Sequence, residues 1–205
     1  LIEDRIVDVD IFMCSNVSRK GLKKIASLFA PTKTYCVIGP SGVGKSTLLN
    51  TLTNSEVYAA DKLFATLDPI TRRLNIPDTV TGKPTTIVIT DTVGFIHELP
   101  PTLMDAFRAT LEEVTDADAL LHVVDLSHPA WQSQIRSVMT ILAEMPETPG
   151  PALVAFNKID EVDGETLKFA HEEYPMAVFI SAAKALGLET LRQRLAQLID
   201  YVIAS

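Results

Sequence analysis

From Thr34 onward, short runs rich in β-branched residues alternate with longer runs whose apolar residues recur every three or four positions. This alternation is typical of a parallel sheet covered by helices. The more continuous apolar runs predict strands that are buried on both faces. The predicted strands are Tyr35–Ile38, about Arg72–Ile76, Thr86–Thr90, Ala119–Val124, Ala152–Phe156 and Ala177–Ile180.

Two stretches show the helical period most clearly. One follows Pro100 and Pro101, a pair suited to a helix start, and the other lies at the C-terminus. Their apolar residues at spacings of three and four predict buried helix faces, and we assign them to the core rather than to a site. These residues are Leu103, Phe107, Leu111 and Val114 in the first helix, and Leu188, Leu191, Leu195, Leu198 and Val202 in the second.

A strand–loop–helix unit occurs twice in the chain. The segment Ile11–Ile25 aligns without gaps on Ala177–Leu191, and the two share a serine, a Gly-Leu pair and a final aliphatic residue. Any βα unit has this general pattern, but the matched positions favour a common origin. We therefore predict an extra N-terminal βα unit in residues 1–32, followed by a main domain in residues 33–205.

Composition limits the classes of protein that need to be considered. A 205-residue chain with 47% hydrophobic and 21% charged residues matches an ordinary globular protein. Cys14 and Cys36 lie in apolar runs, which predicts buried free thiols and a reducing compartment. No apolar run approaches the roughly 18 residues of a membrane span, and no leader has the shape of a signal peptide. We expect a cytoplasmic protein that has no membrane partner.

The net charge of -8 argues against tight nonspecific binding to DNA, because that affinity comes largely from neutralising phosphates. Two local basic patches remain, one at Arg19, Lys20, Lys23 and Lys24 and one at Arg72 and Arg73. Solvated helix or strand faces explain both patches, and RNA contact is the secondary reading.

The run from Gly39 to Ser46 matches the phosphate-loop pattern G-x-x-x-x-G-K-[ST], between a predicted strand and a predicted helix from Thr47 to Leu52. Glycines let successive backbone N–H groups converge on a phosphate at a helix N-terminus. Lys45 is expected to reach the β- and γ-phosphates, and Ser46 to bind Mg²⁺. The predicted nucleotide-binding residues of this loop are Gly39, Ser41, Gly42, Val43, Gly44, Lys45, Ser46 and Thr47.

Asp91, Thr92, Val93 and Gly94 follow the strand that ends at Thr90. This places a carboxylate at the edge of the sheet where ligands of open α/β folds bind. We expect Asp91 to hold Mg²⁺ through water. We expect the N–H of Gly94 to approach the γ-phosphate, because glycine has no Cβ to block it.

The stretch Asn157–Asp160 follows the strand Ala152–Phe156 and indicates which nucleotide base the site binds. An Asp carboxylate can accept from both N1–H and the exocyclic amine of guanine, whereas adenine offers no donor at that edge. Sites built on such hydrogen bonds reject the wrong base by about 10⁴-fold or more. This disfavours an ATP-dependent enzyme. The predicted base-binding residues are Asn157, Lys158, Asp160, Ser181, Ala182 and Ala183.

The order of these motifs is that of the translation-factor-like GTPases, and four further stretches narrow the resemblance. From about residue 50 to 198 the chain resembles the HflX family of ribosome-associated GTPases, in the stretches Leu63–Leu74, Asp91–Pro100, Ala106–Glu113 and His122–Pro129. The resemblance implies a three-layer P-loop NTPase G domain of the α/β class, with a mostly parallel six-stranded sheet and helices on both faces. It implies that Thr66 is the switch threonine contacting Mg²⁺ and the γ-phosphate, so the expected catalytic residues are Lys45, Thr66 and Gly94. The expected metal ligands are Ser46, Thr66 and Asp91.

The same resemblance implies the partners: GTP or GDP, Mg²⁺ and the large ribosomal subunit, and some family members split stalled ribosomes. We expect a monomer. The first 50 residues depart from the family pattern. Residues from about 10 to 48 instead resemble the junction of circularly permuted RsgA-type GTPases. We therefore hypothesise a splice, natural or engineered, in which the C-terminal copy of the repeated unit takes its native place beside Asn157–Asp160. The N-terminal copy would then be an added layer or edge strand, and deletion of residues 1–32 tests which copy completes the G domain.

Two positions within the motifs depart from related GTPases. HflX-like phosphate loops usually carry Asn at the position of Gly42, where it helps to hold a monovalent cation, so we expect no potassium stimulation. Phe95 stands where many small GTPases orient the attacking water with Gln, and His97 is a weaker substitute than a partner group. Two functions stay open: a slow GTPase that acts as a ribosome-associated switch, and a nucleotide-dependent binding module with negligible hydrolysis and lost ribosome recognition.

Overall fold

The computed structural model describes residues 33–53, 70–77, 84–92, 111–145 and 150–204. All of them belong to one compact unit, Lys33–Ser205. The extra N-terminal unit, Thr66, Gly94, Phe95 and His97 lie outside the described residues.

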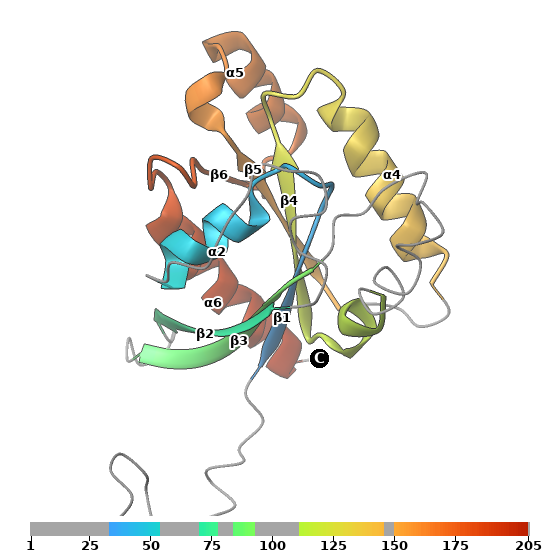
Figure 1. Ribbon diagram of the computed structural model, residues 1–205, viewed down its shortest axis with the longest axis vertical. Coiled ribbons are helices and arrows are strands. Elements are labelled where there is room, and N and C mark those ends of the chain that lie inside the picture. Colours follow the sequence, from blue (N-terminus) through green and yellow to red (C-terminus); the bar gives the residue numbers. More distant parts are fainter. Residues whose placement is uncertain (1–32, 54–69, 78–83, 93–110, 146–149, 205) are drawn as a thin grey trace, which may run out of the picture. The chain divides into compact units, whose positions relative to one another are not determined.

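Six strands form one sheet in the order β2-β3-β1-β4-β5-β6 (Figure 1). The strands are β1 Thr34–Ile38, β2 Ile70–Pro77, β3 Pro84–Asp91, β4 Ala119–Asp125, β5 Ala152–Asn157 and β6 Val178–Phe179. Among these six, β2 is antiparallel to its neighbour, β3, and the other neighbours pair in parallel. The predicted fold class, α/β with a mostly parallel six-stranded sheet, is confirmed.

All six strands differ in length from the prediction, and β2, β3 and β6 differ by two residues or more. β2 extends over Ile70–Pro77 because its antiparallel ladder with β3 continues to the Pro77–Pro84 pair. β6 is shorter than Ala177–Ile180, although the N–H of Ile180 still donates to the carbonyl of Phe156 at 2.8 Å. The chain then turns away at Ser181, which pairs with Leu186 instead of with β5.

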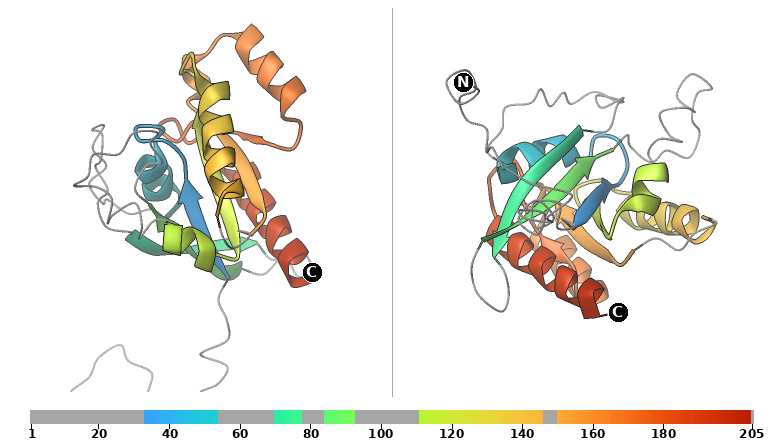
Figure 2. Two further views of the ribbon diagram at one scale, coloured as in Figure 1. Left: turned by 90° about the vertical axis from the view of Figure 1, so that its right-hand side faces the viewer. Right: turned by 90° about the horizontal axis from the view of Figure 1, so that it is seen from below.

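Helices cover both faces of the sheet, and β1 lies in its middle, between β3 and β4. The helices α2 Lys45–Thr53 and α6 Leu188–Ala204 pack on one face, and α4 Trp131–Ala143 and α5 Gly164–Glu173 pack on the other. The right-hand view of Figure 2 shows the strands between α6 and α4. Ligands of such folds bind at the carboxyl ends of the strands, near the point where the strand order reverses.

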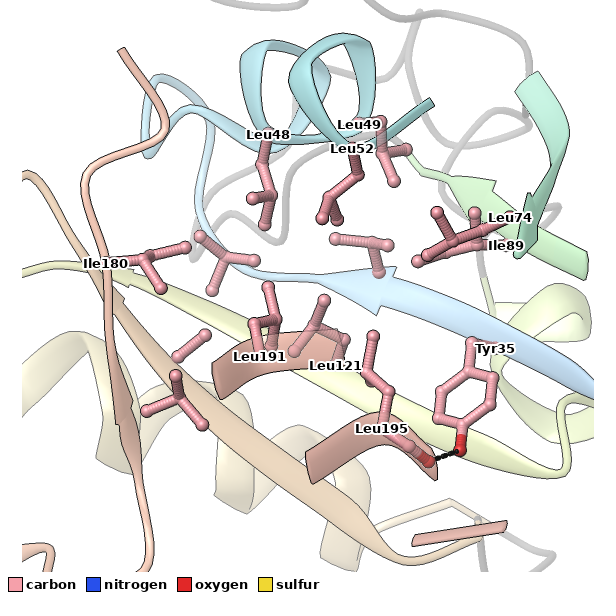
Figure 3. Packing of buried hydrophobic residues seen from close by; sticks show 14 of the residues in the cluster. Tyr35, Leu48, Leu49, Leu52, Leu74, Ile89, Leu121, Ile180, Leu191 and Leu195 are labelled. Carbon is pink, nitrogen blue, oxygen red and sulfur yellow. Dashed lines mark hydrogen bonds between the residues drawn. The ribbon is translucent and has the colours of Figure 1, made fainter. Parts of the chain in front are cut away.

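The larger core lies between α2, the sheet and α6 (Figure 3). Leu48 and Leu49 from α2 are fully buried there. Leu191 and Leu195 from α6 are buried with them, as the helical spacing of the C-terminal stretch predicts. The hydroxyl of Tyr35 donates a 2.6 Å hydrogen bond to the carbonyl oxygen of Leu195, so its polar end is satisfied inside the core.

A second core lies on the opposite face. Leu111 and Val114, which belong to a helical stretch over residues 111–116, pack there with Cys36 and Leu120. Leu103 and Phe107 of the predicted helix lie outside the described residues. Cys36 is a buried free thiol, as predicted, and burial raises its pKa. Within the described part of the chain, no helix combines the length and the apolar character needed to cross a membrane.

Candidate nucleotide-binding site

The loop from Gly39 to Gly44 curls between the end of β1 and the start of α2, and two of its glycines are sterically required. Gly39 has φ 142° and Gly44 has φ 92°. A Cβ on Gly39 would overlap the carbonyl oxygen of Val123, and one on Gly44 would lie 2.5 Å from Nδ2 of Asn157. The phosphate loop therefore packs against β4 and against the end of β5 more closely than any side chain permits.

Lys45 occupies the inside of this loop. Its Nζ donates to the carbonyl oxygens of Gly39 at 2.9 Å and Pro40 at 3.0 Å, and the residue is 7% exposed. Burial lowers the pKa of Lys45 to about 8, and the nearby Asp91 carboxylate partly opposes that shift. The loop thus holds a cation at a helix N-terminus, where an anion is favoured.

Ser46 and Asp91 meet beside the lysine. Ser46 lies in the first turn of α2, Asp91 ends β3, and the serine Oγ donates to Asp91 Oδ2 at 2.5 Å. A hydroxyl and a carboxylate are hard oxygen donors, and Mg²⁺ in nucleotide sites is held by one or two such groups together with phosphates and water. The donor set at this position therefore fits Mg²⁺.

Asn157 joins the phosphate loop to the loop that follows β6. It is 3% exposed, its Nδ2 donates to the carbonyl oxygen of Val43 at 2.8 Å, and its Oδ1 accepts from the N–H of Ala182 at 2.9 Å. Both ends of the side-chain amide are satisfied inside the protein. Asn157 therefore acts as a bridge within the site.

Lys158 turns the chain into a short 3-10 helix, Ile159–Glu161, which carries Asp160. The backbone of Lys158 is left-handed, with φ 62°, and its Nζ lies 2.6 Å from Oδ2 of Asp125. Asp160 is exposed at the edge of the sheet. Its carboxylate is thus accessible to an external hydrogen-bond donor.

The loop after β6 closes the same edge of the sheet. Ser181 and Ala182 are buried, whereas Ala183 is exposed. Ser181 forms a two-way backbone pair with Leu186, and its Oγ accepts from the N–H of Lys184 at 3.1 Å. The loop ends at Gly187, whose φ of 71° and close approach to the carbonyl of Phe179 leave no room for a Cβ.

Contacts bring together Gly39, Val43, Gly44, Lys45, Ser46, Asp91, Asn157 and Ala182. The other described residues that the sequence singled out adjoin these in the chain, namely Ser41, Gly42, Thr47, Lys158, Asp160, Ser181 and Ala183. Hydrogen bonds and close approaches link the phosphate loop with β3, β4, β5 and the loop after β6. The two other predicted catalytic residues, Thr66 and Gly94, lie outside the described residues.

Sequence reasoning missed Asp125, which pairs with Lys158. Its position was the available signal. Asp125 directly follows the apolar run Ala119–Val124 and ends β4, just as Asp91 ends β3 and Asn157 ends β5. It also missed His122, which is fully buried in β4. Burial, aided by the charge of Lys45, lowers the pKa of His122 to about 4, so its ring is neutral. In the described part of the protein, neither ring nitrogen has a hydrogen-bond partner.

With this geometry established, comparison with known proteins decides the family. The sequence model described as "50S ribosome-binding GTPase" matches residues 34–158, more than half of the chain. The chain belongs to this GTPase family. The matched range runs from β1 to Lys158 and thus includes the phosphate loop, Asp91 and the first two residues of the Asn157–Asp160 stretch.

Curated relatives of the family support a more specific resemblance. The chain is 36% identical over 206 residues to GTPase HflX of Escherichia coli, an alignment that covers 100% of this chain and 47% of that protein. It is 43% identical over 165 residues to GTPase HflX of Magnetococcus marinus, covering 80% of this chain and 37% of that protein. The chain therefore spans less than half the length of these relatives.

Solved structures of GTP-binding proteins share the fold. A GTP-binding protein from Sulfolobus solfataricus in complex with GDP is 29% identical, with a TM-score of 0.63, covering 89% of this chain and 57% of that one. A single-residue variant of Aquifex aeolicus Era bound to GDP and AlF4- is 24% identical with a TM-score of 0.63, covering 82% of this chain and 57% of that one. The Era likeness supports the fold alone.

Proposed function

We propose that this chain is the G domain of a ribosome-associated GTPase, which binds GTP with Mg²⁺ and hydrolyses it slowly to GDP and phosphate. The observation that carries the proposal is the double hydrogen bond of Asn157 to Val43 and Ala182. That bridge builds the phosphate loop and the base-reading residues into one site. Membership of the GTPase family supports the same reading.

On the phosphate side, the proposed contacts come from the loop Gly39–Thr47. Lys45 lies within the loop and would exchange its carbonyl contacts for the β- and γ-phosphates. Ser46 and Asp91 would hold Mg²⁺, with Thr66 as the third proposed ligand. When bound, Mg²⁺ would neutralise the charge that develops between the β- and γ-phosphates.

On the base side, the exposed Asp160 would accept from N1–H and the exocyclic amine of guanine. The loop Ser181–Ala183 would donate a backbone N–H to the O6 oxygen. The N–H groups of Ser181 and Ala182 already donate to Leu186 and Asn157, so this donor would be Ala183. We propose guanine as the base on this pattern of donors and acceptors.

For hydrolysis, we propose that Lys45, Thr66 and Gly94 act on the γ-phosphate. Phe95 cannot orient water by a hydrogen bond, so turnover is slow without a partner. The name HflX on the relatives and the ribosome-binding description of the family support the ribosome, and within it the large subunit, as that partner. We propose a cytoplasmic monomer whose rate is the same in potassium and sodium, since Gly42 has no side chain to hold the cation.

A second candidate is a nucleotide-dependent binding module with negligible hydrolysis, which Phe95 and Gly42 favour. Phosphate release by the full chain, with and without purified large ribosomal subunits, separates the two functions. Release that rises with subunits supports the switch. Tight GTP binding with no release in either condition supports the binding module, and failure to bind GTP or GDP contradicts both.

For the N-terminal segment, we propose that residues 1–32 are an extension and residues 33–205 the GTP-binding domain. The alignment of the whole chain with Escherichia coli HflX favours an extension native to this family over a splice with an RsgA-type junction. Deletion of residues 1–32 tests this. Retained GDP binding supports the extension, and lost binding shows that the N-terminal copy of the repeated unit completes the site.

A further inference from the structure

Asp125 ends β4, the strand next to β5, and its side chain contacts the Asn157–Asp160 stretch through the side chain of Lys158. β4 and β5 run side by side (Figure 1), and Asp125 and Asn157 are register partners at their ends. The N–H of Leu126 donates to the carbonyl of Asn157 at 3.0 Å, which continues the pairing one residue further. Backbone hydrogen bonds therefore fix the ends of β4 and β5 to each other directly before Lys158.

The two oxygens of the Asp125 carboxylate have different partners. Oδ1 accepts from the N–H of Ser127 at 3.0 Å and from its Oγ at 2.6 Å, which closes a local turn. Oδ2 accepts from Nζ of Lys158 at 2.6 Å. Because Oδ1 is fixed from two directions, the direction of Oδ2 is fixed as well. The carboxylate is largely buried, with 12% of its side chain exposed.

Lys158 needs such an anchor. Its backbone has φ 62° and ψ 35°, a left-handed conformation that costs a non-glycine residue free energy. The same residue starts the 3-10 helix that carries Asp160, whose carboxylate is exposed at the site. A lysine that lost its ion pair could relax this conformation and turn Asp160 away from the base.

We infer that Asp125 is a positioning residue for guanine recognition: it holds Lys158 in its left-handed conformation and thereby sets the direction of Asp160. This inference rests on the proposed function, because it concerns how the same site binds the base. Asp125 acts through Lys158 and does not touch the nucleotide. Its effect therefore falls on binding and leaves the chemical step unchanged.

The test is a double-mutant cycle on GDP affinity in the full chain, measured with a fluorescent GDP analogue and competition by GDP. Asp125→Asn is expected to weaken GDP binding about tenfold, which corresponds to ~1.4 kcal/mol. In a Lys158→Met background the same change is expected to alter affinity less than about twofold. An equal loss in both backgrounds would mean that Asp125 only supports the Ser127 turn, and it would overturn the inference.

Hydrolysis gives a second readout, since Asp125→Asn should raise KM for GTP about tenfold and leave kcat within about twofold. A lowered kcat at unchanged KM overturns the inference. Glu172→Gln is the matched control, because Glu172 pairs with Lys168 on exposed α5 at 3.8 Å, away from the site. It should leave GDP affinity unchanged.

Circular dichroism without nucleotide checks that each variant is folded. If Asp125→Asn does not fold, Ser127→Ala takes its place, since it removes one hydrogen bond to Oδ1 and keeps the charge pair. We expect it to weaken GDP binding about threefold, and unchanged affinity would overturn the inference.

If the wild-type chain does not bind GDP, the proposed function fails and this inference with it. If the wild type binds and the Asp125 variant binds equally well, only this inference fails.

Discussion

Asn157 and Val43 are 114 positions apart in the chain, and the side-chain Nδ2 of the first donates a 2.8 Å hydrogen bond to the carbonyl of the second. The same side chain accepts from Ala182 at 2.9 Å. One buried amide therefore fixes the distance between the phosphate loop and the base-reading loops. The site is consequently sensitive to changes at a residue that need not contact phosphate or base itself.

Asn157→Ala should damage both stability and binding. Removing the amide leaves the Val43 carbonyl and the Ala182 N–H buried without their partner, at a cost of about 1–3 kcal/mol for each group. We expect the free energy of unfolding to fall by about 2–4 kcal/mol, and GDP affinity to fall at least about tenfold. Chemical denaturation and GDP titration measure the two effects. Asn75→Ala on β2, which removes the exposed hydrogen bond that the Thr86 hydroxyl donates to Oδ1 of Asn75, should change neither by much.

Lys45 makes nucleotide binding depend on pH. The pKa of its ammonium is lowered to about 8 in the free protein by burial, and phosphates would raise that pKa again. Lys45 should therefore take up about half a proton on binding at pH 8 and almost none at pH 6.5. Affinity should fall as pH rises above about 8, while the stability of the free protein gains from the same titration, because the unfolded chain holds the proton more tightly.

Calorimetric GDP titrations in two buffers of different ionisation enthalpy measure this proton uptake directly. A binding enthalpy that does not depend on the buffer at pH 8 contradicts the assignment of Lys45 to the phosphate site.

Gly44→Ala should strongly weaken nucleotide binding while the sheet stays folded. Its Cβ would lie 2.5 Å from Nδ2 of Asn157, at a backbone φ of 92°, so the loop must move away from β5. We expect GDP affinity to fall at least about 100-fold, close to 3 kcal/mol. Gly164→Ala is the matched control. Gly164 is the first residue of α5, and no atom lies within 4 Å of the new Cβ. This substitution should stabilise the protein by about 0.5–1 kcal/mol. Equal affinities of the two variants for GDP would contradict this account of the loop.

His122 should make the fold acid-sensitive. Burial lowers the pKa of His122 to about 4, so the unfolded state binds the proton more tightly, and stability falls as pH falls from about 6.5 toward 4. The loss from this residue between pH 7.5 and pH 5 should be about 2 kcal/mol. His122→Leu should remove that part of the pH dependence and raise stability at pH 5.

Urea denaturation at the two pH values provides the measurement for His122. The exposed His128 supplies the control, since His128→Gln should leave the pH dependence in place. A His122→Leu protein with the wild-type dependence would show that another group is responsible.

The strands and the phosphate loop could be predicted because their signals are local. Apolar runs mark β1, β4 and β5, and the glycine spacing from Gly39 to Gly44 sits between a strand and a helix. The contacts within the site could not be read in this way. Asp125 and Lys158 lie 33 positions apart, and only the parallel register of β4 and β5 brings their side chains together.

The burial of His122 was equally hidden. A histidine in an apolar run can face the core or a ligand. The burial of His122 follows only once helices cover both faces of β4, in which all seven residues are buried. The ends of β2 could not be predicted either. Most of its residues are not fully buried, so its apolar pattern does not show where the strand ends, and its length follows only from the pairing with β3.

Guanine recognition by Asp160 is the central claim, and competition binding of GDP, ADP and xanthosine diphosphate to the wild type and to Asp160→Asn tests it most directly. The wild type should prefer GDP over ADP by about 10⁴-fold or more. Asp160→Asn should lose that preference and favour xanthosine diphosphate, whose donor pattern Asn can match. A wild type that binds ADP as tightly as GDP, or an Asp160→Asn variant that retains its preference for GDP, would contradict the claim.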